Sequence, residues 1–432
     1  MNWELQSGGA VKIFCGEQNE AVKIATRNLA GDIGKVFSGK IAVELSFSGE
    51  AAENTACQSG SESVIVIRQA ELGHKEAYSH SVKDGVLYIE GQDRRGMIYG
   101  IYELSRWLGV SPWYYFADVP VKRRDNAVLA DGYFHTDYPS VEYRGVFIND
   151  EEELDKWVRL HLGEETIGVK AYEKIFELLL RLGANYIWPA MHVNSFNVKR
   201  ENGELADRMG IVVGTSHCDM LMRSNNREWY PWLEKKGYKD VEYDYSIPGK
   251  NRDALNEYWR ESVEQNKDFE VGYTLGMRGI HDTGFETKSL KGLNGEELRK
   301  AKIELLQTII DAQEKILSET LDEEPLKSFV PYKEVLELYD NGLEVPEDLT
   351  LIWTNDNYGY IRRYPGEREK KRKGGNGIYY HNSYWAPPGA SYLFIDSIPL
   401  AHTRNELYKA WREGIRKIWV LNVGAIKPLE QE

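Results

Sequence analysis

The stretch from residue 141 to residue 199 most constrains the fold, because it reads as a strand, a loop, a helix and a second strand. Residues 144–149 form a short apolar run rich in β-forming side chains, and an acidic cluster ends it. Residues 172–182 carry apolar side chains at helical spacing, and Gly183 follows as a typical helix-ending residue. A second apolar run covers residues 186–191. The pattern predicts a βα repeat, in which functional residues occupy the loops after the strands.

The same rhythm continues through the rest of the chain. We expect strands at residues 144–149, 185–190, 211–215, 271–277, 328–332, 349–353, 377–381 and 417–423, and the clearest helices at 252–267, 296–319 and 402–414. Eight strands that alternate with helices predict a (β/α)8 TIM barrel over residues 141–432. An open doubly wound sheet is a weaker alternative, because no GxGxxG motif or P-loop follows any strand. The chain ends soon after Val423, so we expect the barrel to lack its last helix.

Residues 1–140 predict a separate small α/β domain in front of the barrel. Its expected strands are 11–14, 41–47, 64–68 and 85–90, and its expected helices are 19–37 and 95–108. The segment 122–139 is polar and turn-rich and shows neither helical nor strand periodicity. We therefore interpret this segment as the boundary between the two domains.

The composition excludes several classes of protein. A net charge of −14 argues against binding to nucleic acid or to an anionic membrane surface, although one buried arginine can still bind a small anion. The three cysteines form no CxxC pair, which indicates neither a disulfide framework nor a zinc site. The chain as given has no signal peptide and no apolar run that could span a bilayer. These features predict a cytoplasmic protein, and a secreted protein trimmed of its leader would look the same.

Polar side chains follow nearly every predicted strand, and a barrel directs all of them to one mouth. Each has a structural explanation: a helix cap for the Asn and Asp residues, burial in the core for the histidines, and filling of the barrel for the tryptophan. Together they form a more specific pattern than any of them alone. They are Asn149, Asp150 and Glu151, Trp188 and Asn194, His217 and Asp219, Arg278 and Asp282, Lys333 and Glu334, Asn355, Asp356 and Asn357, Tyr380, His381 and Asn382, and Asn422.

These residue types favour glycosidic cleavage over other chemistry. The chain has no GxSxG nucleophile elbow, and a metal site built from His217, Asp219 and His381 lacks a supporting motif such as HExxH. Hydrolysis of a glycoside needs a protonated carboxylic acid at the leaving oxygen and a second carboxylate. Arg278 would suit a sugar carboxylate, which a guanidinium can bind with two parallel hydrogen bonds.

Several segments resemble, in order, the motifs of glycoside hydrolase family 115, the xylan α-1,2-glucuronidases. They include RGVFINDEE, EKIFELLLRLGANYIWPAM, GIVVGTSH, LTLIWTNDNYGYIRR, GIYYHNSYW and IWVLNVGAIKP. The resemblance implies removal of glucuronic acid, or its 4-O-methyl form, from xylose units of glucuronoxylan or its oligosaccharides. It also implies inversion at the anomeric carbon without a metal or other cofactor. The chain looks like the N-terminal and barrel domains of that family, without its C-terminal helical and β-domains.

The resemblance also implies roles for individual residues. Its paired catalytic carboxylates fall on Asp282 as general acid and Glu334 as general base, although these two roles could be exchanged. Arg278 and Asn357 fall where the family positions the attacking water. The other expected substrate-binding or water-binding residues are His217, Trp188, Asn149, Glu151, Tyr380, His381 and Asn422. An inverting mechanism predicts that the two catalytic carboxylates face each other across the barrel mouth, about 6.5–9.5 Å apart.

The chain departs from the family pattern at three places. Asn355 stands where the family commonly has aspartate, and His192 stands where it commonly has tryptophan. Residues 197–199 replace acidic residues that commonly follow the equivalent of Phe196. Two alternatives therefore stay open: a non-catalytic or truncated carbohydrate-binding barrel, and a hydrolase of a different acidic glycan. The presence of both Asp282 and Glu334 favours an enzyme.

Overall fold

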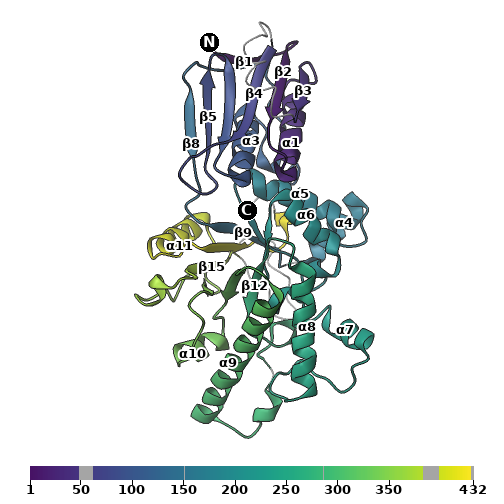
Figure 1. Cartoon of the computed structure of the whole chain (residues 1–432), viewed down its shortest axis with the longest axis vertical. Coiled ribbons are helices and arrows are strands. Elements are labelled where there is room, and N and C mark those ends of the chain that lie inside the picture. Colours follow the sequence, from purple (N-terminus) through teal and green to yellow (C-terminus); the bar gives the residue numbers. More distant parts are fainter. Residues whose placement is uncertain (48–61, 150, 286, 383–397, 430–432) are drawn as a thin grey trace. The chain divides into compact units, whose positions relative to one another are not determined.

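The computed structural model describes residues 1–47, 62–149, 151–285, 287–382 and 398–429, which form two compact units (Figure 1). The first unit comprises Met1–Ser140 together with Glu173–Asn185 and Arg208–Ile211. The second comprises Val141–Tyr172, Tyr186–Asp207 and Val212–Glu432. Two short segments thus belong to the first unit although they lie beyond residue 140, where the sequence places the domain boundary.

The first unit contains a six-stranded mixed sheet and the helices α1 and α3. The sheet order is β3-β2-β4-β6-β5-β8, and α1 and α3 pack against the sheet and against each other. Side-chain caps begin both helices, because Asn19 accepts from the amide of Ala21 and Asp93 accepts from that of Arg95. The elements are β2 (Ala10–Cys15), α1 (Glu20–Val36), β3 (Ala42–Ser46), β4 (Glu62–Gln69), β5 (Tyr78–Lys83), β6 (Val86–Gly91), α3 (Arg94–Leu108), η1 (Pro112–Tyr114) and β8 (Phe134–Asp137), with a separate pair β1 (Trp3–Gln6) and β7 (Asn126–Leu129).

The segment 122–139, which shows neither helical nor strand periodicity in the sequence, contains β7 and β8. Strand β7 pairs antiparallel with β1, and β8 pairs antiparallel with β5 at the edge of the six-stranded sheet. Phe134, at the start of β8, is 66% exposed. An edge strand that buries little apolar surface lacks the alternation from which strands are predicted.

Eight parallel strands form the barrel of the second unit and confirm the predicted fold class. Their order is β11-β10-β9-β16-β15-β14-β13-β12, and a parallel bridge between Val213 and Val271 joins the two ends of this series. All eight strands lie where the sequence predicts them. They are β9 (Tyr143–Phe147), β10 (Tyr186–Trp188), β11 (Val212–Val213), β12 (Gly272–Leu275), β13 (Leu326–Phe329), β14 (Thr350–Thr354), β15 (Asn376–His381) and β16 (Ile418–Asn422).

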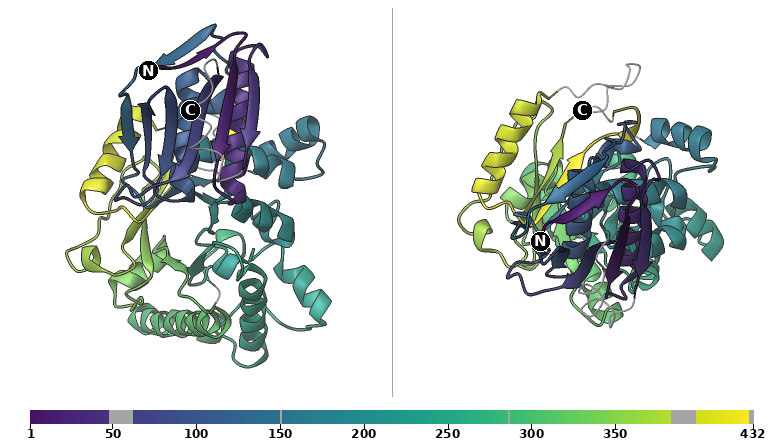
Figure 2. Two further views of the ribbon diagram at one scale, coloured as in Figure 1. Left: turned by 45° about the horizontal axis from the view of Figure 1, so that its top comes forward. Right: turned by 90° about the horizontal axis from the view of Figure 1, so that it is seen from above.

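Helices follow or separate these strands, and α8 and α9 lie side by side (Figure 2). The chain forms α4 (Glu151–Leu162), α5 (Val169–Arg181), α6 (Arg200–Met209), α7 (Trp229–Lys236), α8 (Lys250–Asn266), α9 (Gly295–Thr320), α10 (Glu334–Asp340), α11 (Leu400–Arg412) and α12 (Ile426–Leu429), with short 3-10 helices η2 (Phe196–Val198), η3 (Met220–Met222), η4 (Ile280–Asp282), η5 (Lys288–Leu290) and η6 (Glu369–Lys371). After β16, the described part of the chain forms the four-residue α12. No helix in the described part of the chain is long and apolar enough to cross a membrane.

Large side chains fill the barrel interior. Phe147, Trp188 and Tyr379 contact one another with ring centroids 5.1–5.7 Å apart. Tyr186 lies beside Gly145, where a Cβ atom would fall 1.6 Å from the Tyr186 carbonyl oxygen. Glycine at this position therefore lets β9 and β10 approach closely. The full cluster is Phe147, Tyr186, Trp188, Val212, Val330, Ile352, Tyr379, Ile418 and Val420.

Candidate active site

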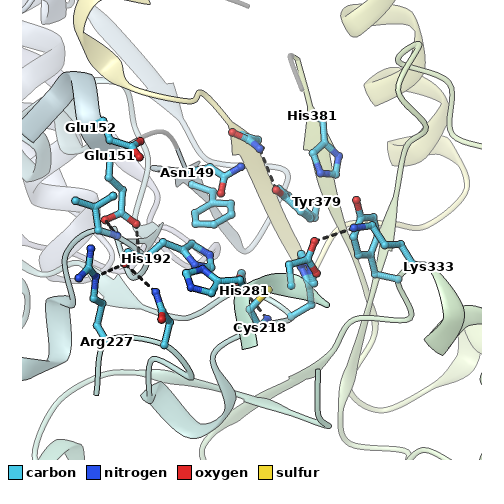
Figure 3. A pocket seen from close by; sticks show the side chains of 18 of the residues that line it. Asn149, Glu151, Glu152, His192, Cys218, Arg227, His281, Lys333, Tyr379 and His381 are labelled. Carbon is cyan, nitrogen blue, oxygen red and sulfur yellow. Dashed lines mark hydrogen bonds and ion pairs between the residues drawn. The ribbon is translucent and has the colours of Figure 1, made fainter. Parts of the chain in front are cut away.

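A cavity of about 650 Å³ opens at the carboxyl ends of the barrel strands (Figure 3). Most of the predicted site residues line it, namely Asn149, Glu151, His217, Asp282, Asn357, His381 and Asn422. The predicted strand-end residue Asp150 lies outside the described part of the chain. Strands distant in sequence thus bring their terminal polar residues together, as a parallel barrel requires.

Trp188 and Tyr380 are among the predicted site residues that do not line this cavity. Trp188 is fully buried in the barrel core, and its Nε1 donates to the hydroxyl of Tyr186 at 3.1 Å. Tyr380 donates its hydroxyl to the carbonyl oxygen of Gly359 at 2.8 Å. Successive side chains of a strand point to opposite faces, so Tyr379 rather than Tyr380 reaches the cavity with His381.

Asp282 lies on the cavity wall, in η4 after β12. Asp282 and His281 both have left-handed backbone conformations, with φ of 59° and 56°. Such a conformation costs a non-glycine residue about 1–3 kcal/mol, and the surrounding structure must hold it. Arg278 supplies part of that support, because its Nη2 lies 2.8 Å from the backbone oxygen of Asp282 and 2.9 Å from Oδ1.

Two further groups contact the Asp282 carboxylate. Nε2 of His217 lies 3.0 Å from Oδ1, and Nζ of Lys333 lies 2.8 Å from Oδ2. Burial raises the pKa of Asp282, but the hydrogen bonds from His217 and Lys333 and the positive charge of Arg278 outweigh burial and hold that pKa well below its usual value. Asp282 is therefore ionised near neutral pH in the unliganded protein. A proton on this carboxylate requires a change in its surroundings.

Glu334 does not line the cavity. It begins α10, and its Oε2 lies 2.7 Å from Nη1 of Arg278. Its side chain borders a separate, smaller cavity of about 170 Å³. The two predicted catalytic carboxylates thus bind the two terminal nitrogens of one guanidinium. Arg278 is 2% exposed, and a buried guanidinium needs counter-charges on both sides of its planar fork.

Three histidines near the cavity are neutral at physiological pH. Burial is the main cause in each case: it lowers the pKa of His192 to about 4 and that of His381 to about 3, and it lowers the pKa of His217. Oδ1 of Asn355 lies 2.8 Å from Nδ1 of His381, which assigns the proton to Nδ1. Nε2 of His381 is then an acceptor. The Nδ2 group of Asn422 donates to the Tyr379 hydroxyl at 3.0 Å.

Glu151 shapes the cavity by binding the backbone. Its carboxylate is 1% exposed and accepts hydrogen bonds from four consecutive amides, of residues 191–194, at 2.6–2.8 Å. Burial raises the pKa of Glu151, whereas these amides oppose the rise. The contacts fix the loop that carries His192 and Val193 into the cavity wall. Glu151 thus holds part of the wall in place through these backbone amides.

Several cavity residues have no clear sequence signal, because they lie on irregular loops beyond the strands. Strand alternation could have found Tyr379, and the sequence names Lys333 as a residue after a predicted strand without giving it a role in the site. The lining residues absent from the predicted site are Phe147, Glu152, His192, Val193, Ser216, Cys218, Asn226, Arg227, His281, Tyr332, Lys333 and Tyr379.

One group in the described part of the chain has the spacing of metal ligands. The ligand atoms of His217, Cys218 and Asp282 lie within 4.8 Å of one another. Burial raises the pKa of the Cys218 thiol well above its usual value, which disfavours the thiolate that binds metals. The negative charge of Asp282 is also already balanced by ion pairs with Arg278 and Lys333. The predicted alternative ligand Asp219 is buried and accepts hydrogen bonds from Ser216 and Asn225. The donor set therefore fits an ion-paired carboxylate better than a metal centre.

The fold and this cavity define a (β/α)8-barrel protein of the kind found among glycoside hydrolases. The chain belongs to glycosyl hydrolase family 115, whose family model matches residues 136–432. This result confirms the family resemblance seen in the sequence. A search of curated proteins gave no match.

Solved structures of glycoside hydrolases resemble the chain. The 4-O-methyl-α-glucuronidase BtGH115A, described as specific for decorated arabinogalactans, is 34% identical and superposes with a TM-score of 0.85. That match covers 99% of this chain and 56% of BtGH115A, so the chain spans little more than half the length of this relative. The N-acetyl-β-hexosaminidase of Streptomyces plicatus is 12% identical, with a TM-score of 0.57, and the match covers 100% of this chain and 84% of that one. At such low identity it shows the fold alone.

Proposed function

We propose that the protein is an inverting glycoside hydrolase that removes glucuronic acid, or its 4-O-methyl form, α-1,2-linked to xylose in glucuronoxylan. One observation carries the proposal: in a family 115 barrel, the Asp282 carboxylate lies on the cavity wall and is held by His217, Arg278 and Lys333. A carboxylate at the strand ends is what acid–base cleavage of a glycoside needs. The positive charges beside it also suit an acidic sugar.

The proposed mechanism uses two carboxylates. Asp282 meets the glycosidic oxygen as general acid, because it is the member of the pair that lines the cavity. Glu334 serves as general base for the attacking water, which Arg278 and Asn357 orient. Because Glu334 lies against Arg278 in the unliganded protein, that ion pair must rearrange before the carboxylate reaches water. Tyr379, His381 and Asn422 contribute hydrogen-bonding groups around the sugar.

A second candidate substrate is favoured by one specific observation. BtGH115A, which is 34% identical over nearly the whole of this chain, is described as acting on decorated arabinogalactans. The same exo-cleavage of a terminal 4-O-methylglucuronic acid would then act on a galactose-based polymer. Asp282, Glu334 and Arg278 would have the same roles, and the difference would lie in the residues that meet the polymer.

Both candidates can be tested in one assay. The protein is incubated with glucuronoxylan and with arabinogalactan, and released uronic acid is measured by anion-exchange chromatography. Release from glucuronoxylan alone supports the first candidate, and release from arabinogalactan alone supports the second. Proton NMR of the first sugar released shows the β-anomer if the mechanism inverts. A wild-type protein that releases no uronic acid from either polymer contradicts the proposed activity.

A further inference from the structure

We propose that Lys333 selects acidic sugars, by exchanging its contact with Asp282 for one with the carboxylate of the bound sugar. The inference rests on the proposed function and gives a role to a residue that the sequence places after a predicted strand but to which the family motifs assign none. Lys333 lines the cavity, and its Nζ lies 2.8 Å from Oδ2 of Asp282. Its side chain is 49% exposed, so an entering anion can reach the ammonium group.

The charges around the cavity leave few partners for a carboxylate. Two of its described lining residues carry a permanent positive charge, Lys333 and Arg227. Burial lowers the pKa of His192 and His381 and makes both neutral near pH 7. Arg278 does not line the cavity and already binds Asp282 and Glu334. Among the described lining residues, Lys333 and Arg227 are therefore the candidates for an ion pair with an acidic sugar.

The chemistry of the sugar distinguishes these two cations. In a uronic acid the carboxylate is attached to C5, and C5 and the anomeric carbon share the ring oxygen. The carboxylate is therefore bound within one sugar ring of the bond that Asp282 cleaves. Lys333 contacts Asp282 directly, whereas Arg227 lies beside Glu151 and His192 at the other end of the cavity (Figure 3) and donates its Nε to the backbone oxygen of His192. Lys333 has the required position.

The backbone gives a second, independent indication. Lys333 has φ of 51° and ψ of −123°, an unfavourable conformation for a residue with a side chain. It precedes α10 but makes no capping hydrogen bond there, so helix capping does not explain the conformation. Asp282 is also left-handed, with φ of 59°. Strained residues concentrate where geometry serves function, and here two of them meet through their side chains.

The exchange has a consequence for catalysis. When Lys333 turns to the sugar, Asp282 keeps its contacts with the neutral His217 and with Arg278, which also binds Glu334. Asp282 loses the ammonium group of Lys333 and gains the negatively charged carboxylate of the sugar as a neighbour. Each change raises the pKa of Asp282, which favours the protonated form that a general acid needs. An acidic sugar therefore promotes protonation of its own catalyst, and a neutral sugar does not. The titratable or charged groups around Asp282 are His192, His217, Cys218, Arg278, Lys333 and His381.

Titration calorimetry with D-glucuronic acid and D-glucose tests the role of Lys333. We expect wild-type protein to prefer glucuronic acid, and Lys333→Met to weaken its binding about 10- to 100-fold, as expected for one lost charged hydrogen bond, without changing glucose binding. Lys333→Arg should keep much of the preference. Lys370→Met is the matched control. Lys370 does not line the cavity, and its Nζ forms an ion pair with Oε2 of Glu413 at 2.9 Å. This control should bind both sugars as wild type does.

Several outcomes would overturn the inference. A preference for glucuronic acid that survives in Lys333→Met contradicts it, as does a preference lost in Arg227→Met but not in Lys333→Met. Equal weakening of both sugars in Lys333→Met would show a structural role, and thermal melts of each variant identify a folding defect. If Lys333→Met is misfolded, loss of the preference in a folded Lys333→Arg protein also contradicts it. A wild-type protein without any preference contradicts the proposed function as well as the role of Lys333.

Discussion

Oδ1 of Asn355 lies 2.8 Å from both the backbone nitrogen and Nδ1 of His381. The Nδ2 group of Asn355 in turn donates to the backbone oxygen of His381 at 2.9 Å. One amide thus fixes the position of the histidine and its tautomer. The sequence marks Asn355 as a departure from an aspartate that is common in the family. The structure shows what the substitution removes: a negative charge beside an imidazole that lines the cavity.

We predict that Asn355→Asp makes His381 easier to protonate. A carboxylate at this position would stabilise the imidazolium, which opposes the burial that lowers the pKa of His381 to about 3. NMR titration of the imidazole should show this pKa rising by one unit or more, on the order of a close charge pair in a protein. Asn341→Asp, which adds the same charge at an exposed position on another loop, should leave it unchanged. An unchanged His381 pKa in Asn355→Asp would show that burial alone determines it.

A second prediction concerns Glu334. Glu334→Gln should lower turnover by about 10²- to 10⁴-fold, the usual contribution of a general base, while the affinity for glucuronic acid stays largely intact because Glu334 does not line the cavity. Release of uronic acid from glucuronoxylan measures the first quantity and calorimetry the second. Glu337→Gln, an exposed glutamate on the same helix, is the control.

A competing assignment can be separated in the same experiment. Glu152 lines the cavity and carries a carboxylate, so it is the other candidate for the second catalytic group. Full turnover in Glu334→Gln together with loss of turnover in Glu152→Gln would transfer the role of base to Glu152. Loss of substrate binding in Glu334→Gln would instead indicate that Arg278 depends on Glu334 for its position.

Periodicity predicts the strands of this barrel well, because several of them, such as β10, β11, β12 and β15, are buried along their whole length. It fails for β8, a mostly exposed strand at a sheet edge. The same distinction applies to the predicted site residues, which the sequence places well only where they lie at strand ends. Residues at a strand end or a few positions beyond it, such as Asn422 at the end of β16 and His217 after β11, reach the cavity because strand ends converge.

For the remaining site residues, packing in three dimensions determines whether the side chain reaches the cavity and what it contacts. The sequence could not decide whether Trp188 fills the barrel or binds a sugar, since an aromatic residue near a strand end suits both roles. The partners of Arg278 and the backbone turn at Lys333 depend on contacts between β12, β13 and their loops. No pattern along the chain encodes those contacts.

We predict an acid-dependent loss of stability through His80. Burial lowers its pKa in the folded protein to about 4, against 6.5 for the exposed side chain. Between these values the unfolded chain binds a proton that the folded protein does not, so the stabilisation is complete above pH 6.5 and is lost as pH falls toward 4. At pH 5 the loss amounts to about 2 kcal/mol. Urea unfolding at pH 7.5 and pH 5 measures it.

Two histidine variants separate this effect from general acid sensitivity. Glutamine at position 80 can still donate to the carbonyl oxygen of Gly100, which Nε2 of His80 contacts at 2.8 Å, but it does not titrate. His80→Gln should therefore lose less stability between the two pH values than wild type. His161→Gln, at an exposed position on α4, should behave as wild type. Identical pH slopes for His80→Gln and wild type would refute the assignment.

The last prediction concerns the close approach of β9 and β10 at Gly145. A Cβ atom there would lie 1.6 Å from the carbonyl oxygen of Tyr186, a backbone atom in the middle of the barrel, so the strands must separate to admit it. Gly145→Ala should therefore cost about 3 kcal/mol or more, at or above the usual range for overpacking. Gly31→Ala is the control, because Gly31 is an exposed helical residue with no atom within 4 Å of the added Cβ. It should stabilise the protein by about 0.5–1 kcal/mol, since alanine favours helix. Denaturant unfolding of both variants gives the comparison, and a Gly145→Ala protein as stable as wild type would contradict the close strand contact.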